Sequence, residues 1–389
     1  MSGVVIVGAG QAAAECATAL RAGGYSAPII IVGDEPYLPY QRPPLSKDFL
    51  SGKSPYEKLL LRPSDFWQAQ KVSLELGAPV KSIDRTKKRI ALAGDKSLEY
   101  DILVLATGTR SRIPPIAGVA LDRVHLLRRI EDVKRLRPAL DAAKRVAIVG
   151  GGYIGLEVAA VARSEGRDIV VIEAEERLMK RVTSLPISTF YEGMHRSHGV
   201  DIRLRSKIEA IEGDTRAQRV RVGNEHIESD LVLIATGAQP NEELALDAGL
   251  ACDNGIVVDE TARTADEHIY AIGDCTRFPS RRYGRRIRLE CVQNAFDQAK
   301  AAAAAILGKG APYDPVPWFW SDQYQVKFQS AGLSEGHDEA ILIGDPATAR
   351  FSVEYRKNGK LIAVDAVNDG HAYMAGRKRI TAETGSADT

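Results

Sequence analysis

The sequence has few cysteines, and their spacing forms no functional pair. The four, Cys16, Cys252, Cys275 and Cys291, include no CxxC or CxxxxC arrangement. This spacing argues against a disulfide framework, a zinc knuckle or a redox dithiol, and no metal site is expected. We interpret the cysteines as small, buried apolar residues.

The sequence also lacks a charge excess and a long apolar run. Lys and Arg number 52 against 51 Asp and Glu, so the net charge of +1 offers no chain-wide field for nucleic acid or an acidic membrane. No stretch of about 18 apolar residues occurs, and the chain opens on a strand-like run, MSGVVIVGAG, without signal-sequence features. We therefore expect a cytoplasmic protein. At 389 residues it should contain two or three domains.

One segment occurs twice. VVIVGAGQAAAECATALRAGG at residues 4–24 is similar to VAIVGGGYIGLEVAAVARSEG at residues 146–166, and a second β-branched run follows each copy. Both copies predict the order strand, glycine turn, helix, strand, which is a βαβ unit. LVLATG at 103–108 and LVLIATG at 231–237 form a second matched pair, where we expect the chain to pass between domains.

The first βαβ unit carries a dinucleotide-binding fingerprint. Small residues stand where the backbone must approach a pyrophosphate at a helix N-terminus, and these are Gly8, Gly10, Ala12 and Ala13. Asp34, with Glu35 beside it, is the expected ribose ligand, and a solvated turn is the alternative. In YAIGD, an apolar strand leads to Asp274, which suits a polyol and phosphate unless it merely caps the strand.

The second unit carries the complete fingerprint. Its residues are Gly150, Gly152, Tyr153, Ile154 and Gly155. Glu173 follows the second strand, where a carboxylate accepts hydrogen bonds from ribose hydroxyls and repels a 2′-phosphate. This pattern favours NADH over NADPH, although Arg177 is close enough to argue for the phosphate. Because a flavin can accept hydride from nicotinamide and release electrons singly, we expect FAD in the first unit and NADH in the second.

Longer motifs resemble one family over essentially the whole chain. GDEPYLPYQRPPLSKDFLSG, RLECVQNAFDQAK and PWFWSDQY, with both glycine motifs and YAIGD, resemble the oxygenase-coupled NADH-dependent ferredoxin reductases, the family of putidaredoxin reductase. The resemblance implies a glutathione-reductase-like α/β fold with two Rossmann-like dinucleotide-binding domains and a small α+β C-terminal domain. The expected segments are 1–111 and 238–314 for FAD, 112–237 for NAD, and 315–389 for the C-terminal domain.

The implied activity is transfer of hydride from NADH to FAD and of single electrons to a [2Fe-2S] ferredoxin. That ferredoxin would feed a cytochrome P450 or a Rieske-type ring-hydroxylating oxygenase. Apoptosis-inducing factor shares the motifs, so a redox-switched interaction protein is the alternative. A disulfide reductase or NADH peroxidase needs a redox cysteine early in the chain, and only Cys16 is available.

The resemblance also assigns site residues. It places Arg42 and Lys47 of YQRPPLSK at FAD, with the Lys47 ammonium near the reactive end of the isoalloxazine, where a cation favours the reduced flavin. Glu157 resembles the carboxylate near the nicotinamide and could pair with Lys47, and Trp320 resembles the tryptophan at the flavin and nicotinamide. A solvated loop lysine and a helix-dipole glutamate are the alternatives. Further contacts carried over are Val80, Arg112 and Gln293 to FAD, and Gly237 to NAD.

An arginine-rich segment is a candidate docking surface. Residues 277–288 contain six arginines in twelve positions, directly after Asp274. An acidic ferredoxin would need such a local basic patch on a chain that is neutral overall. A solvated basic hairpin is the alternative of equal weight.

Overall fold

The computed structural model describes residues 3–384. Its contacts divide the chain into two compact units. The first unit contains residues up to 41, 56–110 and 239–317, and the second contains 42–55, 111–238 and 318 onward. The chain passes from one unit to the other after residues 110 and 238, shortly after the matched LVLATG and LVLIATG segments. The domain boundaries expected from the sequence remain a prediction.

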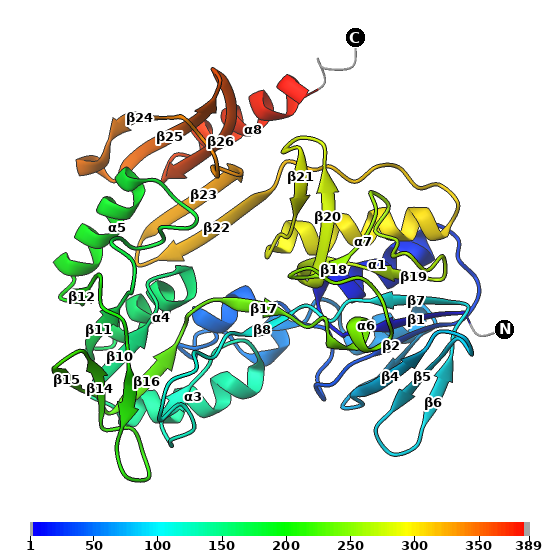
Figure 1. Cartoon of the computed structure of the whole chain (residues 1–389), viewed down its shortest axis with the longest axis horizontal. Coiled ribbons are helices and arrows are strands. Elements are labelled where there is room, and N and C mark those ends of the chain that lie inside the picture. The colour runs from blue at the N-terminus through cyan, green and yellow to red at the C-terminus, as the bar shows by residue number, and fades with distance from the viewer. Residues whose placement is uncertain (1–2, 385–389) are drawn as a thin grey trace. The chain divides into compact units, whose positions relative to one another are not determined.

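The first unit is built on a parallel five-stranded sheet with the order β19-β7-β1-β2-β3 (Figure 1). The strands are short, and β1, β2, β7 and β19 are almost entirely buried, as parallel strands usually are, whereas the edge strand β3 is partly exposed. Helices α1 (Gln11–Ala22) and α7 (Val292–Ile306) are rich in alanine, which lets them pack closely against each other. The strands are β1 (Val4–Val7), β2 (Ile29–Val32), β3 (Val72–Glu75), β7 (Ile102–Leu105) and β19 (Ile269–Ala271).

Smaller elements complete the first unit. An antiparallel sheet contains β4 (Val80–Asp84), β5 (Arg89–Leu92) and β6 (Ser97–Glu99). A second small sheet contains β18 (Ile256–Val257), β20 (Thr276–Ser280) and β21 (Arg285–Ile287), so the arginine-rich segment forms a β-hairpin. The short helices are η2 (Tyr56–Leu59), α2 (Ser64–Ala69), α6 (Glu243–Asp247) and η3 (Gly273–Cys275). At the crossings lie β8 (Thr109–Ser111) and β17 (Ala238–Pro240).

The second unit repeats the parallel design in the order β12-β11-β10-β16-β9. The strands are β9 (Val124–His125), β10 (Arg145–Val149), β11 (Asp168–Ile172), β12 (Asp201–Arg203) and β16 (Leu231–Ile234). The helices are η1 (Pro43–Ser46), α3 (Ile130–Ala142), α4 (Tyr153–Ser164) and α5 (Leu185–Ser197). A three-stranded sheet is formed by β13 (Ala210–Glu212), β14 (Arg219–Val222) and β15 (Glu225–Glu228).

The C-terminal part of the second unit is an antiparallel sheet with the order β22-β23-β26-β25-β24. Helix α8 (Gly370–Thr384) packs on β23 and β26. The strands are β22 (Trp318–Gln323), β23 (Val326–Gly332), β24 (Glu339–Asp345), β25 (Arg350–Lys357) and β26 (Lys360–Val367), with η4 (Pro346–Thr348) between β24 and β25. Asn358 and Gly359 join β25 to β26 with φ of 50° and 76°, as a tight hairpin turn requires. The expected α/β fold with a small α+β C-terminal part is therefore confirmed.

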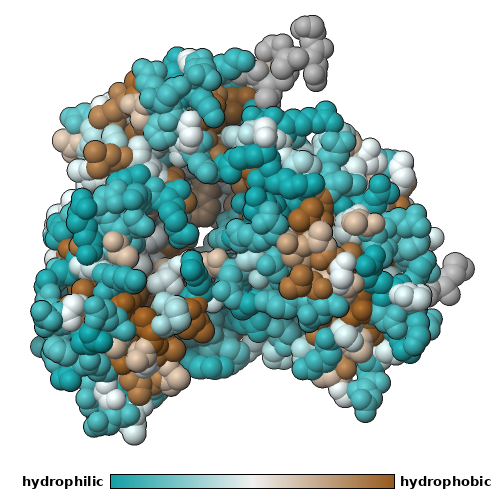
Figure 2. All heavy atoms as spheres, viewed as in Figure 1, coloured by the Kyte–Doolittle hydropathy of each residue, from teal (hydrophilic) through white to brown (hydrophobic). Residues whose placement is uncertain are grey.

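Hydrophilic side chains cover most of the face drawn in Figure 2, with apolar residues in separate patches. Among residues 3–384, no helix combines the length and the apolar composition needed to cross a membrane.

Candidate active site

The first glycine of each fingerprint packs closely against the backbone of the matched ATG segment, which leaves no room for a side chain. Gly8 has φ of +112°, and a Cβ there would lie 2.1 Å from the Ala106 carbonyl oxygen. Gly150 has φ of +111°, and its Cβ would lie 2.4 Å from the Ala235 oxygen. No other residue type fits either position without strain. The glycine turn therefore packs against the ATG segment in the same way in both units.

The second glycine of each fingerprint has a different explanation. A Cβ at Gly10 or Gly152 would meet no heavy atom of the described chain within 4 Å. Both residues cap a twelve-residue helix, α1 or α4, without a side-chain hydrogen bond to its first amides. Open space beside free helix N-terminal amides is what a closely bound pyrophosphate needs. The residues therefore fit a dinucleotide in each unit.

The third position of the fingerprint packs the helix against the strand. A Cβ at Gly155 would lie 2.3 Å from the Gly150 oxygen, whereas Ala13 is accommodated, fully buried, in the first unit. Ala12 approaches the YAIGD segment, because a Cβ at Gly273 would lie 3.1 Å from its methyl carbon. The glycine turn and the start of η3 thus meet in the first unit.

The acidic residues of the first unit differ in exposure. Asp34 is exposed, whereas Glu35 is buried and accepts a hydrogen bond from the Tyr40 hydroxyl at 2.7 Å. Asp34 is therefore the more accessible of the two predicted ribose ligands. Asp274 is partly buried, and its Oδ2 lies 3.5 Å from the Thr109 hydroxyl. Of the other predicted FAD contacts in this unit, Val80 begins β4, and Gln293 is buried and donates to Asp297 at 2.7 Å.

In the second unit, Glu173 is anchored by backbone amides. Its Oε2 accepts from the Gly151 N–H at 2.6 Å and its Oε1 from the Glu175 N–H at 2.9 Å. These bonds fix the carboxylate beside the glycine turn. Arg177, which argued for a 2′-phosphate, donates to the Thr183 oxygen and the Ser188 hydroxyl, both at 2.7 Å, and to the Lys180 oxygen at 3.0 Å. Its guanidinium is thus engaged by its own loop and by the first turn of α5.

Two other predicted contacts of the second unit lie side by side. The Arg112 N–H donates to the Gly237 oxygen at 2.9 Å, and the Thr236 hydroxyl donates to the Arg112 oxygen at 2.8 Å. The side chain of Arg112 is exposed. Arg181 lies beside them, because its guanidinium is 3.2 Å from where a Cβ on Gly237 would stand. Sequence reasoning did not name Arg181 as a neighbour of this site, since it belongs to no recognised motif.

Lys47 and Glu157 form the predicted ion pair. The Lys47 Nζ lies 2.8 Å from the Glu157 Oε1. Glu157 is only 4% exposed, and two hydroxyls donate to its carboxylate, Ser321 at 2.6 Å to Oε1 and Ser46 at 2.5 Å to Oε2. A buried carboxylate is tolerated when it is paired and hydrogen-bonded in this way. Sequence reasoning missed both serines, although they belong to the YQRPPLSK and FWSDQY motifs.

The predicted FAD contact Arg42 and the catalytic candidate Trp320 belong to the same unit. The Arg42 guanidinium donates to the Arg128 oxygen at 2.6 Å. Trp320 is partly buried on β22, with its ring centroid 5.7 Å from that of Trp318. Alternation along the strand places Trp320 and Ser321 on opposite faces. The roles of Arg42, Lys47, Glu157 and Trp320 toward a flavin remain predictions.

The cysteines do not have the properties of a redox centre. All four are free, and Cys16 is fully buried, so desolvation raises the pKa of its thiol to about 12. Burial likewise raises the pKa of Cys252 to about 11 and that of Cys291 to about 12. Cys275 is buried too, and burial raises its pKa. Because the thiolate is the reactive form, none suits disulfide exchange at neutral pH.

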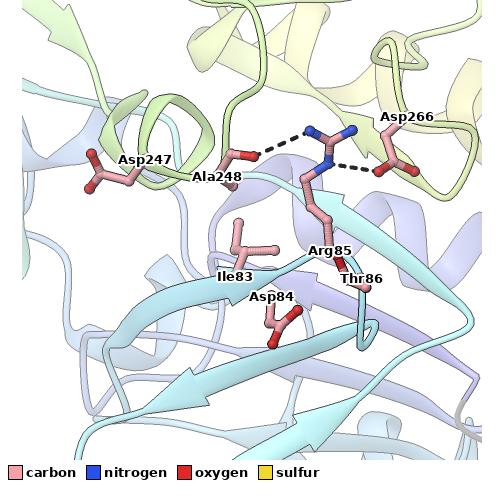
Figure 3. Close-up of a pocket in the computed structure, with 7 residues that line it drawn as sticks. All are labelled: Ile83, Asp84, Arg85, Thr86, Asp247, Ala248 and Asp266. Carbon is pink, nitrogen blue, oxygen red and sulfur yellow. Dashed lines mark hydrogen bonds and ion pairs between the residues drawn. The ribbon is translucent and has the colours of Figure 1, made fainter.

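A surface pocket of about 570 Å³ lies elsewhere in the first unit, between the loop after β4 and helix α6 (Figure 3). Arg85 crosses it, bonded to Asp266 at 2.8 Å and to the Ala248 oxygen at 3.3 Å. No predicted site residue lines it. The glycine turns, in contrast, combine open space beside Gly10 and Gly152 with the N-terminal amides of a helix.

Comparison with known proteins places the chain among flavoprotein reductases. Residues 2–302 match the pyridine nucleotide-disulphide oxidoreductase family model, and residues 318–388 match a reductase C-terminal model. The chain is 41% identical to a ferredoxin–NAD(P)(+) reductase of Sphingomonas sp, over 98% of this chain and 93% of that protein. It is 39% identical to the ferredoxin–NAD(+) reductase component of an anthranilate 1,2-dioxygenase system from Burkholderia cepacia, over 97% and 94%. The structure of a covalent putidaredoxin reductase–putidaredoxin complex superimposes with a TM-score of 0.95 at 41% identity, covering 98% of this chain and 93% of that one.

Proposed function

The chain belongs to the pyridine nucleotide-disulphide oxidoreductase family, and we propose that it is an FAD-dependent NADH:ferredoxin oxidoreductase. It takes hydride from NADH onto FAD and passes single electrons to a [2Fe-2S] ferredoxin. One observation carries this proposal: relatives that reduce ferredoxins match the chain over nearly its whole length, including the C-terminal module. The high thiol pKa values, with Cys16 raised to about 12, speak against dithiol chemistry.

We assign FAD to the first glycine turn. The amides that follow Gly10 bind the pyrophosphate, and the exposed Asp34 accepts hydrogen bonds from the ribose. Bound FAD supplies the step from hydride to single electrons. Further proposed FAD contacts are Gly8, Ala12, Ala13, Glu35, Arg42, Val80, Arg112, Asp274 and Gln293.

We assign NADH to the second glycine turn. Glu173, held by two backbone amides, presents a fixed carboxylate to the adenosine ribose and repels a 2′-phosphate. The engagement of Arg177 within its own loop supports NADH as the preferred donor. Further proposed NAD contacts are Gly150, Gly152, Tyr153, Ile154, Gly155 and Gly237.

Three side chains are proposed to act at the reacting atoms. The Lys47 ammonium, held by Glu157, stabilises negative charge where it accumulates during flavin reduction. Glu157 keeps that ammonium in place and cannot move readily, because two serines also bind it. Trp320 offers a flat aromatic surface that can stack and exclude water.

The proposed partner is a [2Fe-2S] ferredoxin that supplies a cytochrome P450 or a ring-hydroxylating oxygenase. The relative from a dioxygenase system and the reductase–putidaredoxin complex support this choice. We propose a cytoplasmic location, which four unpaired thiols favour. We also propose that residues 1–111 and 238–314 form the FAD domain, residues 112–237 the NAD domain and residues 315–389 the C-terminal domain.

The test is NADH-driven cytochrome c reduction with and without candidate [2Fe-2S] ferredoxins. A reductase should show a rate that depends on the ferredoxin and saturates with it. If NADH reduced the flavin but no acidic [2Fe-2S] ferredoxin accepted electrons, the interaction-protein alternative would be favoured. A protein that bound no FAD would contradict the proposal outright.

A further inference from the structure

A chain of buried hydrogen bonds leads away from Glu157. Ser321 donates to the Glu157 Oε1 at 2.6 Å, the Gln323 amide nitrogen donates to the Ser321 hydroxyl oxygen at 3.2 Å, and the His195 Nε2 lies 2.8 Å from the Gln323 Oε1. Glu157, Ser321, Gln323 and His195 are 4%, 0%, 1% and 0% exposed. Alternation along β22 puts Ser321 and Gln323 on one face, and His195 comes from the last turn of α5. All of these residues belong to the second unit.

The carboxylate sets the direction of every bond in this chain. An ionised Glu157 only accepts, so the Ser321 hydroxyl proton points toward it, and the Ser321 oxygen is left to accept from the Gln323 amide. The Gln323 oxygen must then accept, which requires a proton on the His195 Nε2. Burial lowers the pKa of His195 to about 4, so its ring is neutral at neutral pH, with a bare Nδ1.

The bare Nδ1 of His195 is buried and has no hydrogen-bond partner within residues 3–384. Such an unsatisfied buried acceptor is costly, and an apolar side chain at this position would avoid the cost. Simple packing therefore does not account for a histidine here. The hydrogen bond between its ring Nε2 and Gln323 is the feature that an apolar residue could not provide.

We propose that Gln323 and His195 are positioning residues of the active site, which through Ser321 hold the Glu157 carboxylate in the orientation that places the Lys47 ammonium. This inference rests on the proposed function, since it concerns the same site. Gln323 prevents the Ser321 hydroxyl from rotating toward another acceptor, and His195 prevents the Gln323 amide from flipping. Neither residue touches a cofactor in this role.

The first experiment is a double-mutant cycle on reduction of the flavin by NADH, measured in the FAD-loaded protein without ferredoxin. Gln323→Leu should slow this step by roughly three- to tenfold, an effect typical of residues in one hydrogen-bond network, with little change in the dissociation constant for NADH. It should also lower the flavin midpoint potential, in the same direction as removal of the Lys47 charge. In a Glu157→Gln background, Gln323→Leu should have almost no further effect. Gln325→Leu, at an exposed position just beyond β22, is the matched control.

Equal losses from Gln323→Leu in both backgrounds would overturn the proposal, because they would show that Gln323 acts independently of Glu157. If Gln323→Leu does not fold, the pair His195→Gln and His195→Leu decides. Glutamine can still donate an N–H to Gln323 and should keep the wild-type rate and potential, whereas leucine should not. Identical behaviour of the two would assign His195 to packing alone. If NADH failed to reduce the flavin of the wild-type protein, that result would instead refute the proposed function.

Discussion

Asp365 offers a quantitative test of how the C-terminal sheet is packed. It lies on β26, 1% exposed, and accepts a hydrogen bond from the Tyr355 hydroxyl at 2.5 Å. Burial raises the pKa of this carboxyl from 3.8 to about 7. Between these values the folded protein holds a proton that the unfolded chain has lost. Stability should therefore fall as pH rises from about 4 to about 7, and the loss should be complete above that range.

The difference of roughly three pKa units corresponds to a loss of about 4 kcal/mol, taken as an upper limit. Asp365→Asn removes the titration and keeps the volume and an oxygen that can accept from Tyr355. The variant should match the wild type near pH 4 and exceed it in stability at pH 8. Denaturant unfolding followed by tryptophan fluorescence measures this, since Trp318 and Trp320 lie on β22 of the same sheet.

Asp322→Asn is the matched control, because Asp322 is exposed on the same sheet. It shows how removal of an exposed carboxylate from the same sheet changes the free energy of unfolding. Wild-type and Asp365→Asn profiles that run parallel from pH 4 to pH 8 would refute the reasoning, because Asp365 would then titrate alike in the folded and unfolded protein.

Three further outcomes are expected at the proposed sites. NADH should bleach the flavin far faster than NADPH, and Glu173→Gln should narrow that preference by about tenfold, through loss of a charged hydrogen bond to the ribose; equal wild-type rates with both donors would contradict the NADH assignment. Lys47→Met should retain FAD, lower the midpoint potential of the flavin and slow its reduction by at least about tenfold. An unchanged rate of reduction would show that Lys47 has no role in hydride transfer. Reversal of Arg281, Arg282 and Arg285 to Glu should weaken electron transfer to ferredoxin, as about 0.5 M salt should, while reduction by NADH stays constant; wild-type rates with ferredoxin would place docking elsewhere.

In the arginine-rich hairpin, several arginines already pair with acidic residues, as the alternative of a solvated basic hairpin predicts. Arg277 lies 3.4 Å from Asp253, Arg281 lies 2.8 Å from Glu260, and Arg288 lies 2.5 Å from Glu290. Acidic neighbours thus offset part of the charge, which the bare sequence could not reveal. The Arg281–Glu260 pair is well exposed, so it contributes little and is screened by salt, which leaves Arg281 able to exchange partners.

The sequence by itself determined the features that depend on near neighbours. Two βαβ units follow from the repeated glycine turns, and the β25–β26 hairpin follows from Asn358-Gly359, because φ preferences and side-chain periodicity act over a few residues. The acidic residue after a strand, Glu173, could be placed for the same reason. Resemblance of longer motifs added the pairing of Lys47 with Glu157, which the structure contains.

Only the tertiary structure decided which partners these residues have. Ser46 and Ser321 meet at Glu157 from positions more than 100 residues away on either side, and His195 reaches Gln323 across 128 residues. A sequence pattern specifies the type of a side chain and the face on which it stands, but packing of distant segments specifies what it contacts. Burial is likewise a property of the folded chain, so the raised pKa of a carboxyl such as Asp365 arises only when the sheet and its helix exclude water from it.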